Sequence, residues 1–109
     1  MKIYRSCNKY HSQKTIIDGI KFDSKKEAKR YIELKLMERA RAISDLQTQV
    51  RFPIIKKSQY GKEIVYIADF TYIEDGKLVV EDTKGFKTDV YLLKRRLMQE
   101  VHGITIKET

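Results

Sequence analysis

A chain of 109 residues has the length of a single domain, and its 41% of hydrophobic residues is enough to form a core. The 23 Lys and Arg residues outnumber the 15 Asp and Glu residues, and the net charge of +8 favours a polyanionic partner, most often nucleic acid. No apolar stretch reaches the length of a membrane span, and the single cysteine, Cys7, cannot form an internal disulfide, so we expect a cytoplasmic protein without a membrane partner.

The N-terminal part of the chain is expected to contain a basic arm and a hairpin. Residues 1–13 are polar and basic, which is typical of a loosely ordered arm. Residues 14–109 contain no linker or internal repeat, so we expect them to form one domain. Near its start, Asp18 and Gly19 stand between two short apolar runs, and this pattern predicts a β-hairpin with a two-residue turn.

A helix and three strands are predicted in the middle of the chain. Ser24 and Glu27 have the Ser-x-x-Glu spacing of a capping box, so a helix is expected from there to about Arg41. Residues that favour β-structure then predict strands at 46–55, 63–73 and 77–84. Pro53 predicts that the first of these strands lies at a sheet edge or contains a bulge. Apolar residues on both faces of the second strand predict a central position.

The C-terminal part is expected to contain a second helix and a last strand. The helix begins at Thr88 or Asp89, ends at Gly103, and carries apolar residues on one side, namely Val90, Leu93, Leu97 and Val101. The short apolar run at 104–106 predicts the strand. The order helix, three strands, helix, strand predicts an α/β fold in which a mixed four-stranded sheet is flanked by helices and preceded by the hairpin.

Two carboxylates and a lysine are expected on one face of this sheet. If Asp75 and Gly76 form a two-residue turn, paired residue numbers in the hairpin sum to 151, and Asp69 lies opposite Asp82. Lys84 lies two residues beyond Asp82, so its side chain is on the same face.

Carboxylates that lie this close need a physical reason, because like charges repel and their burial is costly unless a cation intervenes. A divalent cation such as Mg²⁺ prefers oxygen ligands, polarises a phosphate and lowers the pKa of bound water. Lys84 can orient that water or stabilise negative charge developing on the phosphate. The alternative is a cross-strand Asp–Lys salt bridge with Asp69 solvated. It explains poorly why Asp69 and Asp82 interrupt two runs that otherwise look buried.

The arrangement resembles a known superfamily of enzymes. The marks are Asp-Gly-Ile-Lys-Phe-Asp-Ser-Lys-Lys-Glu-Ala at 18–28, Ile-Ala-Asp-Phe at 67–70 and Glu-Asp-Thr-Lys-Gly at 81–85. With the element order, they resemble the PD-(D/E)XK nuclease superfamily. From about residue 9 to residue 97 the chain is similar to a small phage- and prophage-borne family within it. Ala68 replaces the proline of the literal motif, and Val50 stands where proline is expected after Gln49.

The resemblance implies a restriction-endonuclease-like core and Mg²⁺-dependent hydrolysis of DNA phosphodiester bonds, with Mn²⁺ as a substitute ion. By position, Asp69 and Asp82 would be metal ligands and Lys84 the catalytic lysine. It also implies roles in phage recombination or replication, with branched DNA such as a Holliday junction as the substrate.

Glu27 and Gln49 each have two interpretations. The Glu27 carboxylate either caps its helix by bonding to Ser24 or joins the metal site, as a helix glutamate does in many members of the superfamily. Gln49 resembles a polar residue that lies near the cleft in related transposon-end nucleases, although a solvated glutamine on a strand explains it nearly as well.

Three basic residues of the second helix and the loop before it, Lys87, Lys94 and Arg95, are candidates for contacts with DNA phosphates. A solvated basic helix face is the alternative. We also expect a homodimer, because one domain has one site and cutting two strands takes two. Two other functions stay open, a catalytically silent nucleic-acid-binding module and a phage protein-interaction factor on the same fold.

Overall fold

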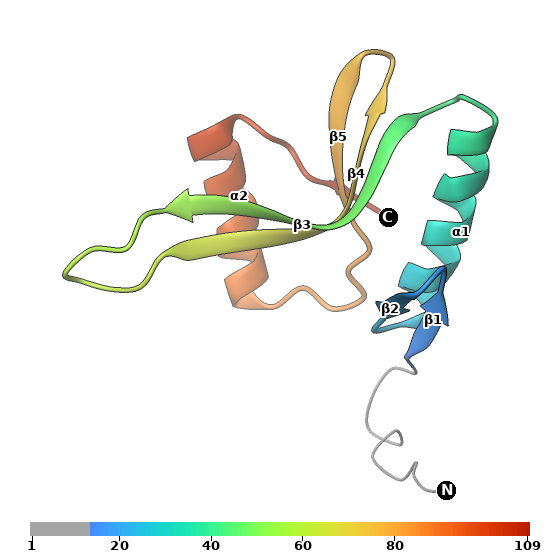
Figure 1. The fold of residues 1–109 in the computed structure, drawn as a ribbon. Coiled ribbons are helices and arrows are strands. Elements are labelled where there is room, and N and C mark those ends of the chain that lie inside the picture. The colour runs from blue at the N-terminus through green and yellow to red at the C-terminus, as the bar shows by residue number, and fades with distance from the viewer. Residues whose placement is uncertain (1–13) are drawn as a thin grey trace, which may run out of the picture.

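The computed structural model describes residues 14–109, and the arm predicted at 1–13 lies outside these residues. These residues form a two-stranded hairpin, a four-stranded sheet and two helices. Figure 1 shows how these elements are arranged. The predicted α/β class and the order of its elements are therefore confirmed. Within the described residues, neither helix combines the length and the apolar character that crossing a membrane requires.

The hairpin and the first helix form as the local sequence predicts. They are β1 (Thr15–Ile17), β2 (Ile20–Phe22) and α1 (Lys25–Arg39). Asp18 and Gly19 form the turn with φ of 53° and 77°, the positive values that a type I′ turn requires. The Ser24 hydroxyl accepts a hydrogen bond from the backbone N–H of Glu27 at 3.1 Å, which caps the helix.

The main sheet is mixed. Its strands are β3 (Ser44–Ile55), β4 (Ile64–Glu74), β5 (Lys77–Asp82) and β6 (Lys107–Glu108). They lie in the order β3-β4-β5-β6, with antiparallel pairing except between β5 and β6. β4 is thus central, as predicted. β3 is an edge strand whose register shifts between Pro53 and Ile55, so both features predicted from the proline are present.

Two strand boundaries differ from the prediction. β5 ends at Asp82, two residues early, because the backbone N–H of Thr83 donates to the Asp69 side chain instead of a strand partner. The last strand is Lys107–Glu108, so the prediction of a strand at 104–106 was wrong. The N–H of Ile104 donates to the Met98 carbonyl at the end of the helix, and the chain reaches β5 only after this turn.

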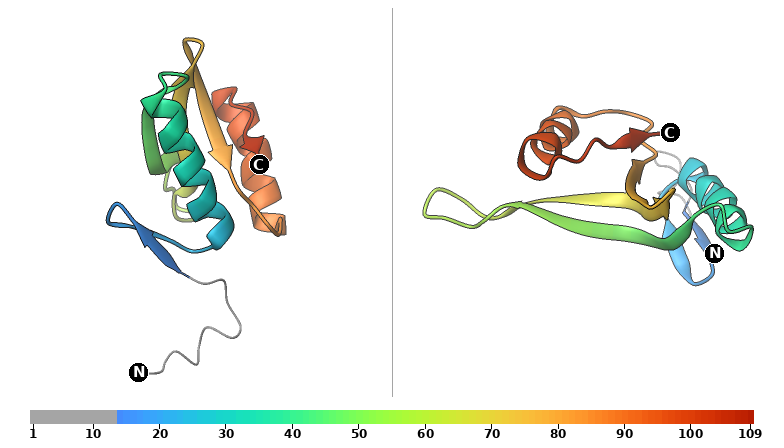
Figure 2. Two further views of the ribbon diagram at one scale, coloured as in Figure 1. Left: turned by 90° about the vertical axis from the view of Figure 1, so that its right-hand side faces the viewer. Right: turned by 90° about the horizontal axis from the view of Figure 1, so that it is seen from above.

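Two apolar clusters stabilise the fold. One joins α1 and the hairpin to the sheet, and the other lies between α2 (Asp89–His102) and the sheet. Figure 2 shows the two helices against different parts of the sheet. Phe70 and Tyr72 of β4 belong to the first cluster, whereas Tyr66 and Ala68 of the same strand belong to the second.

The apolar side predicted for α2 does not form the core. Val90, Leu93 and Val101 are exposed, and the buried residues of this helix are Tyr91 and Met98. The spacing of apolar residues marks a helix, but here the buried side is set by the large side chains that fill the space under the sheet.

Candidate active site

The predicted register is confirmed. Phe70 pairs with Glu81 and Glu74 pairs with Lys77, so paired numbers sum to 151. Asp75 and Gly76 have φ of 53° and 74°, as the Asp-Gly turn requires. The next positions along this ladder are those of Asp69 and Asp82, and both lie where β5 ends.

Asp82 is fully buried at the end of β5. The Tyr66 hydroxyl donates to its Oδ2 at 2.5 Å. Its Oδ1 lies 3.9 Å from Lys84 Nζ and, among residues 14–109, has no hydrogen-bond partner. A buried carboxylate oxygen without a partner is costly, so this atom has unused capacity to bind a cation or a proton.

Asp69 lies beside it and is held by Thr83. The backbone N–H and the hydroxyl of Thr83 both donate to Asp69 Oδ2 at 2.9 Å. These bonds link the carboxylate of β4 to the residue that follows Asp82. The prediction that the two carboxylates lie next to each other on the sheet is therefore confirmed.

The electrostatics of the pair follow from this geometry. Burial, the largest cause, raises the pKa of Asp82, and the negative charge of Asp69 raises it further. The hydrogen bond from Tyr66 and the charge of Lys84 oppose the shift without cancelling it. A cation bound beside Asp82 would offset both the burial and the repulsion that raise the pKa of this carboxyl.

Lys84 lies at the solvent side of the pair. Its side chain is 38% exposed, and its ammonium lies over the Tyr91 ring, 5.3 Å from the centroid. The distance of 3.9 Å to Asp82 is too long for a hydrogen bond, so Lys84 does not neutralise Asp82 as a close salt bridge would. Its ammonium can therefore act on an anion that approaches the pair from solvent.

Glu27 of α1 is a buried neighbour of this pair. Its carboxylate accepts a hydrogen bond from the Gln49 side-chain amide at 3.0 Å. Burial, followed by the charges of Asp69, Asp23 and Asp82, raises the pKa of Glu27 to about 7. The backbone of Glu27 thus serves the helix cap, while its side chain points toward Gln49.

Gln49 has an unusual backbone for a strand residue. Its φ is 53°, and by count it lies opposite Asp69, between the pairs Thr48–Phe70 and Val50–Ala68. A non-glycine residue in this region costs on the order of 1–3 kcal/mol and is often found at functional sites. This conformation accompanies the bond from Gln49 to Glu27.

Seven side chains of β3, β4, β5, the loop after β5 and the two helices thus define the candidate site. They are Glu27, Gln49, Tyr66, Asp69, Asp82, Lys84 and Tyr91. The two tyrosines were missed in the sequence. Their signal was a large aromatic on the central strand and another on the second helix, each with a hydroxyl that needs a partner when buried.

The three basic residues predicted to bind DNA lie on α2 or in the loop before it and differ in their surroundings. Lys87 is exposed and Lys94 is half-buried. Arg95 Nη1 donates to Glu108 at 2.9 Å, and the same carboxylate accepts a bond from the Tyr91 hydroxyl. Arg95 therefore forms an ion pair that links α2 to β6, and this pair partly neutralises its charge.

The number of side chains that could bind a metal ion at this site is small. Within residues 14–109, no group of three His, Cys, Asp or Glu side chains is arranged to hold a metal ion. Asp69 and Asp82 are adjacent carboxylates that could hold an ion, and their assignment as ligands, like that of Glu27, stays a prediction. Two carboxylates suffice for Mg²⁺, which keeps several of its waters in most protein sites.

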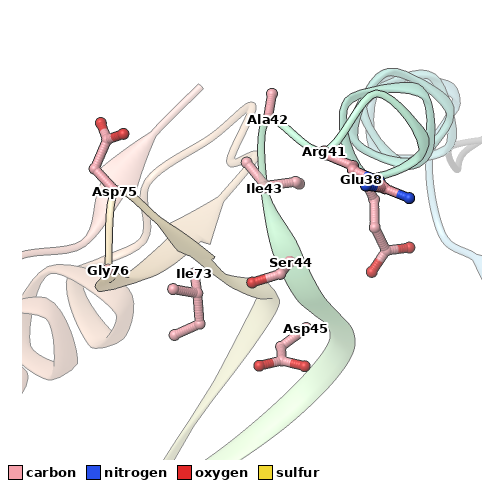
Figure 3. A pocket seen from close by; sticks show the side chains of 9 residues that line it. All are labelled: Glu38, Arg41, Ala42, Ile43, Ser44, Asp45, Ile73, Asp75 and Gly76. Carbon is pink, nitrogen blue, oxygen red and sulfur yellow. The ribbon is translucent and has the colours of Figure 1, made fainter.

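A separate hollow of about 500 Å³ lies at the other end of β4 and β5, beside their turn (Figure 3). Its charged lining residues are Glu38, Asp45, Asp75 and Arg41. Three carboxylates against one guanidinium disfavour a phosphodiester, and the hollow is remote from Asp82 along the strand.

One protein family matches a part of the chain that includes the whole candidate site. The family described as "Protein of unknown function (DUF1064)" matches residues 7–107. The chain belongs to this family. No curated protein and no solved structure matches the chain. Every side chain of the candidate site lies within the part that matches DUF1064.

Proposed function

We propose that this DUF1064 protein is a metal-dependent DNA endonuclease with a restriction-endonuclease-like core of the PD-(D/E)XK kind. The observation that carries the proposal is the buried Asp82, whose Oδ1 has no partner within residues 14–109, next to Asp69 and below Lys84. A structural role alone leaves two adjacent acids and an unpaired buried oxygen unexplained.

The residues present fit a hard divalent cation. Asp69 and Asp82 offer carboxylate oxygens, the donors that Mg²⁺ and Mn²⁺ accept, and their mutual repulsion is relieved by positive charge. These two residues would hold the ion. When bound, Mg²⁺ polarises a phosphate and makes water a stronger nucleophile near neutral pH.

The other side chains would position the groups that react. Tyr66 fixes the orientation of the Asp82 carboxylate through its hydrogen bond to Oδ2, so Oδ1 is the oxygen left to bind the ion. Lys84, held over the Tyr91 ring, would place its ammonium against a phosphate oxygen and stabilise charge that develops there. Glu27 and Gln49 would complete the polar wall of the site.

DNA as the substrate is supported by charge. The net charge of +8 supplies the attraction for phosphates that most DNA-binding domains use. Branched DNA as the preferred form follows from the family resemblance alone and belongs to the same proposal.

The test is cleavage of labelled linear, flapped and four-way DNA by the purified protein, with Mg²⁺, with Mn²⁺ and with EDTA. We expect cuts with either ion and none with EDTA. DNA binding in EDTA serves as the control for a folded protein. Binding without cleavage of any substrate would replace the endonuclease with a silent nucleic-acid-binding module.

A further inference from the structure

The β3–β4 hairpin extends beyond the rest of the molecule as a two-stranded arm (Figure 1, left). We define the arm tip as residues 56–63. The arm is held at its base, where Phe52 and Ile54 pack against the cluster under α2. His102 of α2 also donates through Nε2 to the Pro53 carbonyl at 2.7 Å. The arm therefore leaves the body in a fixed direction.

The arm tip is ordered. Ser58 and Gly61 exchange two backbone hydrogen bonds of 3.0 and 3.2 Å, and the Ser58 hydroxyl accepts from the N–H of Tyr60 at 3.1 Å. These bonds close a tight turn with Tyr60 at its apex. The Tyr60 residue is 90% exposed, so a large aromatic ring is held in solvent by a defined turn.

Basic residues lie on both sides of Tyr60 in the sequence of the arm tip. Lys56, Lys57 and Lys62 are exposed and, with Arg51, line a shallow hollow of about 810 Å³. Among residues 14–109, the acidic residue that lines the hollow is Glu63, which is paired with Arg51 at 2.6 Å. Within these residues the three lysines therefore have no acidic partner in the hollow.

We propose that this arm is a DNA-binding element, in which the three lysines contact backbone phosphates and Tyr60 stacks on an unpaired base. The inference rests on the proposed function, because it takes the substrate to be DNA. A two-stranded ribbon fits the major groove of duplex DNA, and exposed aromatics stack on bases that have left the helix.

The spacing suits a nuclease. Asp69 lies eight positions after Gly61, and β4 begins at Ile64 within this stretch. At the rise of an extended chain, the arm tip lies roughly 26 Å from the carboxylates. This distance is roughly eight base pairs of duplex. The arm would bind one part of a branched DNA while the candidate site cleaves another part. Tyr60 would favour DNA that has an unpaired base at the branch.

The experiment measures binding of the full chain to labelled linear duplex and four-way DNA in EDTA, over a range of salt. The triple variant K56Q/K57Q/K62Q should bind about tenfold more weakly, and its salt slope should fall by about 2.7. The matched control K14Q/K21Q/K77Q removes the same charge from exposed positions outside the arm and should change both values little. Equal losses in the two variants would overturn the role of the arm.

Tyr60 is tested separately. Tyr60→Ala should weaken four-way DNA binding by about tenfold and linear duplex much less, whereas Tyr60→Phe keeps the ring and should behave as wild type. Unchanged four-way binding by Tyr60→Ala overturns the stacking role. Stronger competition by single-stranded RNA than by DNA of the same length would overturn the assignment of DNA. Because no metal is present, failed cleavage with these binding results would refute the nuclease and leave the arm as a DNA-binding element.

Discussion

Asp82 and Glu27 are buried acids whose pKa values lie above their ordinary range, and the cause is burial among other carboxylates. In the unfolded chain both groups ionise near their ordinary pKa, 3.8 for Asp82 and 4.5 for Glu27. Between these ordinary values and about pH 7, the Asp82 and Glu27 carboxyls keep their protons in the folded protein but have lost them in the unfolded chain. These two groups therefore favour folding at low pH, and this contribution is lost as the pH rises through about 7.

We predict that the metal-free protein is more stable at pH 5.5 than at pH 8, by on the order of 2 kcal/mol. Urea denaturation in EDTA at the two pH values measures the difference. Glu27→Gln, which cannot ionise, should reduce it. Mg²⁺ added at pH 8 should stabilise the wild type and restore much of the loss. A protein that gains stability from pH 5.5 to pH 8 in EDTA contradicts this account of the site.

Glu81 is also a buried acid, but its pKa is shifted in the opposite direction, and its partner lies on another element. Burial raises the pKa of Glu81, but hydrogen bonds from Arg30 and Tyr72 outweigh it and leave the pKa below the ordinary value. Arg30 donates to both Glu81 oxygens, at 2.6 and 3.0 Å. This pair ties α1 to β5 one residue before Asp82, so it also fixes the strand that carries the site.

Arg30→Ala should destabilise the protein by about 3–5 kcal/mol, because it leaves the Glu81 charge buried without its main partner. The midpoint of urea denaturation at pH 7 measures the loss. Arg39→Ala, an exposed arginine on the same helix, is the matched control and should cost less than about 0.5 kcal/mol. Equal effects of the two substitutions would show that the pair does not hold the elements together.

The elements also show what the sequence can predict. Asp-Gly turns require positive φ at both residues, so the turns, and through them the register of Asp69 and Asp82, follow from local chemistry. The end of β5 does not, because it is set by the bond from Thr83 to Asp69 across strands. The left-handed backbone of Gln49 likewise cannot be predicted from the local sequence, since it accompanies a hydrogen bond to Glu27, a helix residue 22 positions earlier.

At the scale of the whole molecule, the expected homodimer stays a prediction. The sequence offers two apolar surfaces for it, the hairpin with Ile16, Ile17 and Ile20 and the first helix with Leu34 and Met37. Leu34 is fully buried and Ile17, Ile20 and Met37 pack against the core, whereas Ile16 is 71% exposed. The hairpin edge around Ile16 is thus what remains of those surfaces. Because one chain carries one site, two-strand cutting takes two copies.

We predict a dimer mass by light scattering at micromolar protein when four-way DNA is present. Free protein and protein with linear duplex are the comparisons. A monomer mass under all three conditions would contradict the prediction and would point to a nicking enzyme.

We infer that Asp69, Asp82 and Lys84 together carry out the metal-dependent cleavage of DNA. Its most direct test compares cleavage rates of wild type, Asp82→Asn and Lys84→Ala with Mg²⁺, at protein concentrations that give equal DNA binding. We expect both variants to be slower by at least roughly 100-fold. DNA affinity should be largely retained, because Asp82→Asn leaves every basic residue in place and Lys84→Ala removes one of the 23 Lys and Arg residues. Asp45→Asn, in the separate hollow of Figure 3, should cut at the wild-type rate. Cleavage at the wild-type rate by Asp82→Asn and Lys84→Ala would contradict the account.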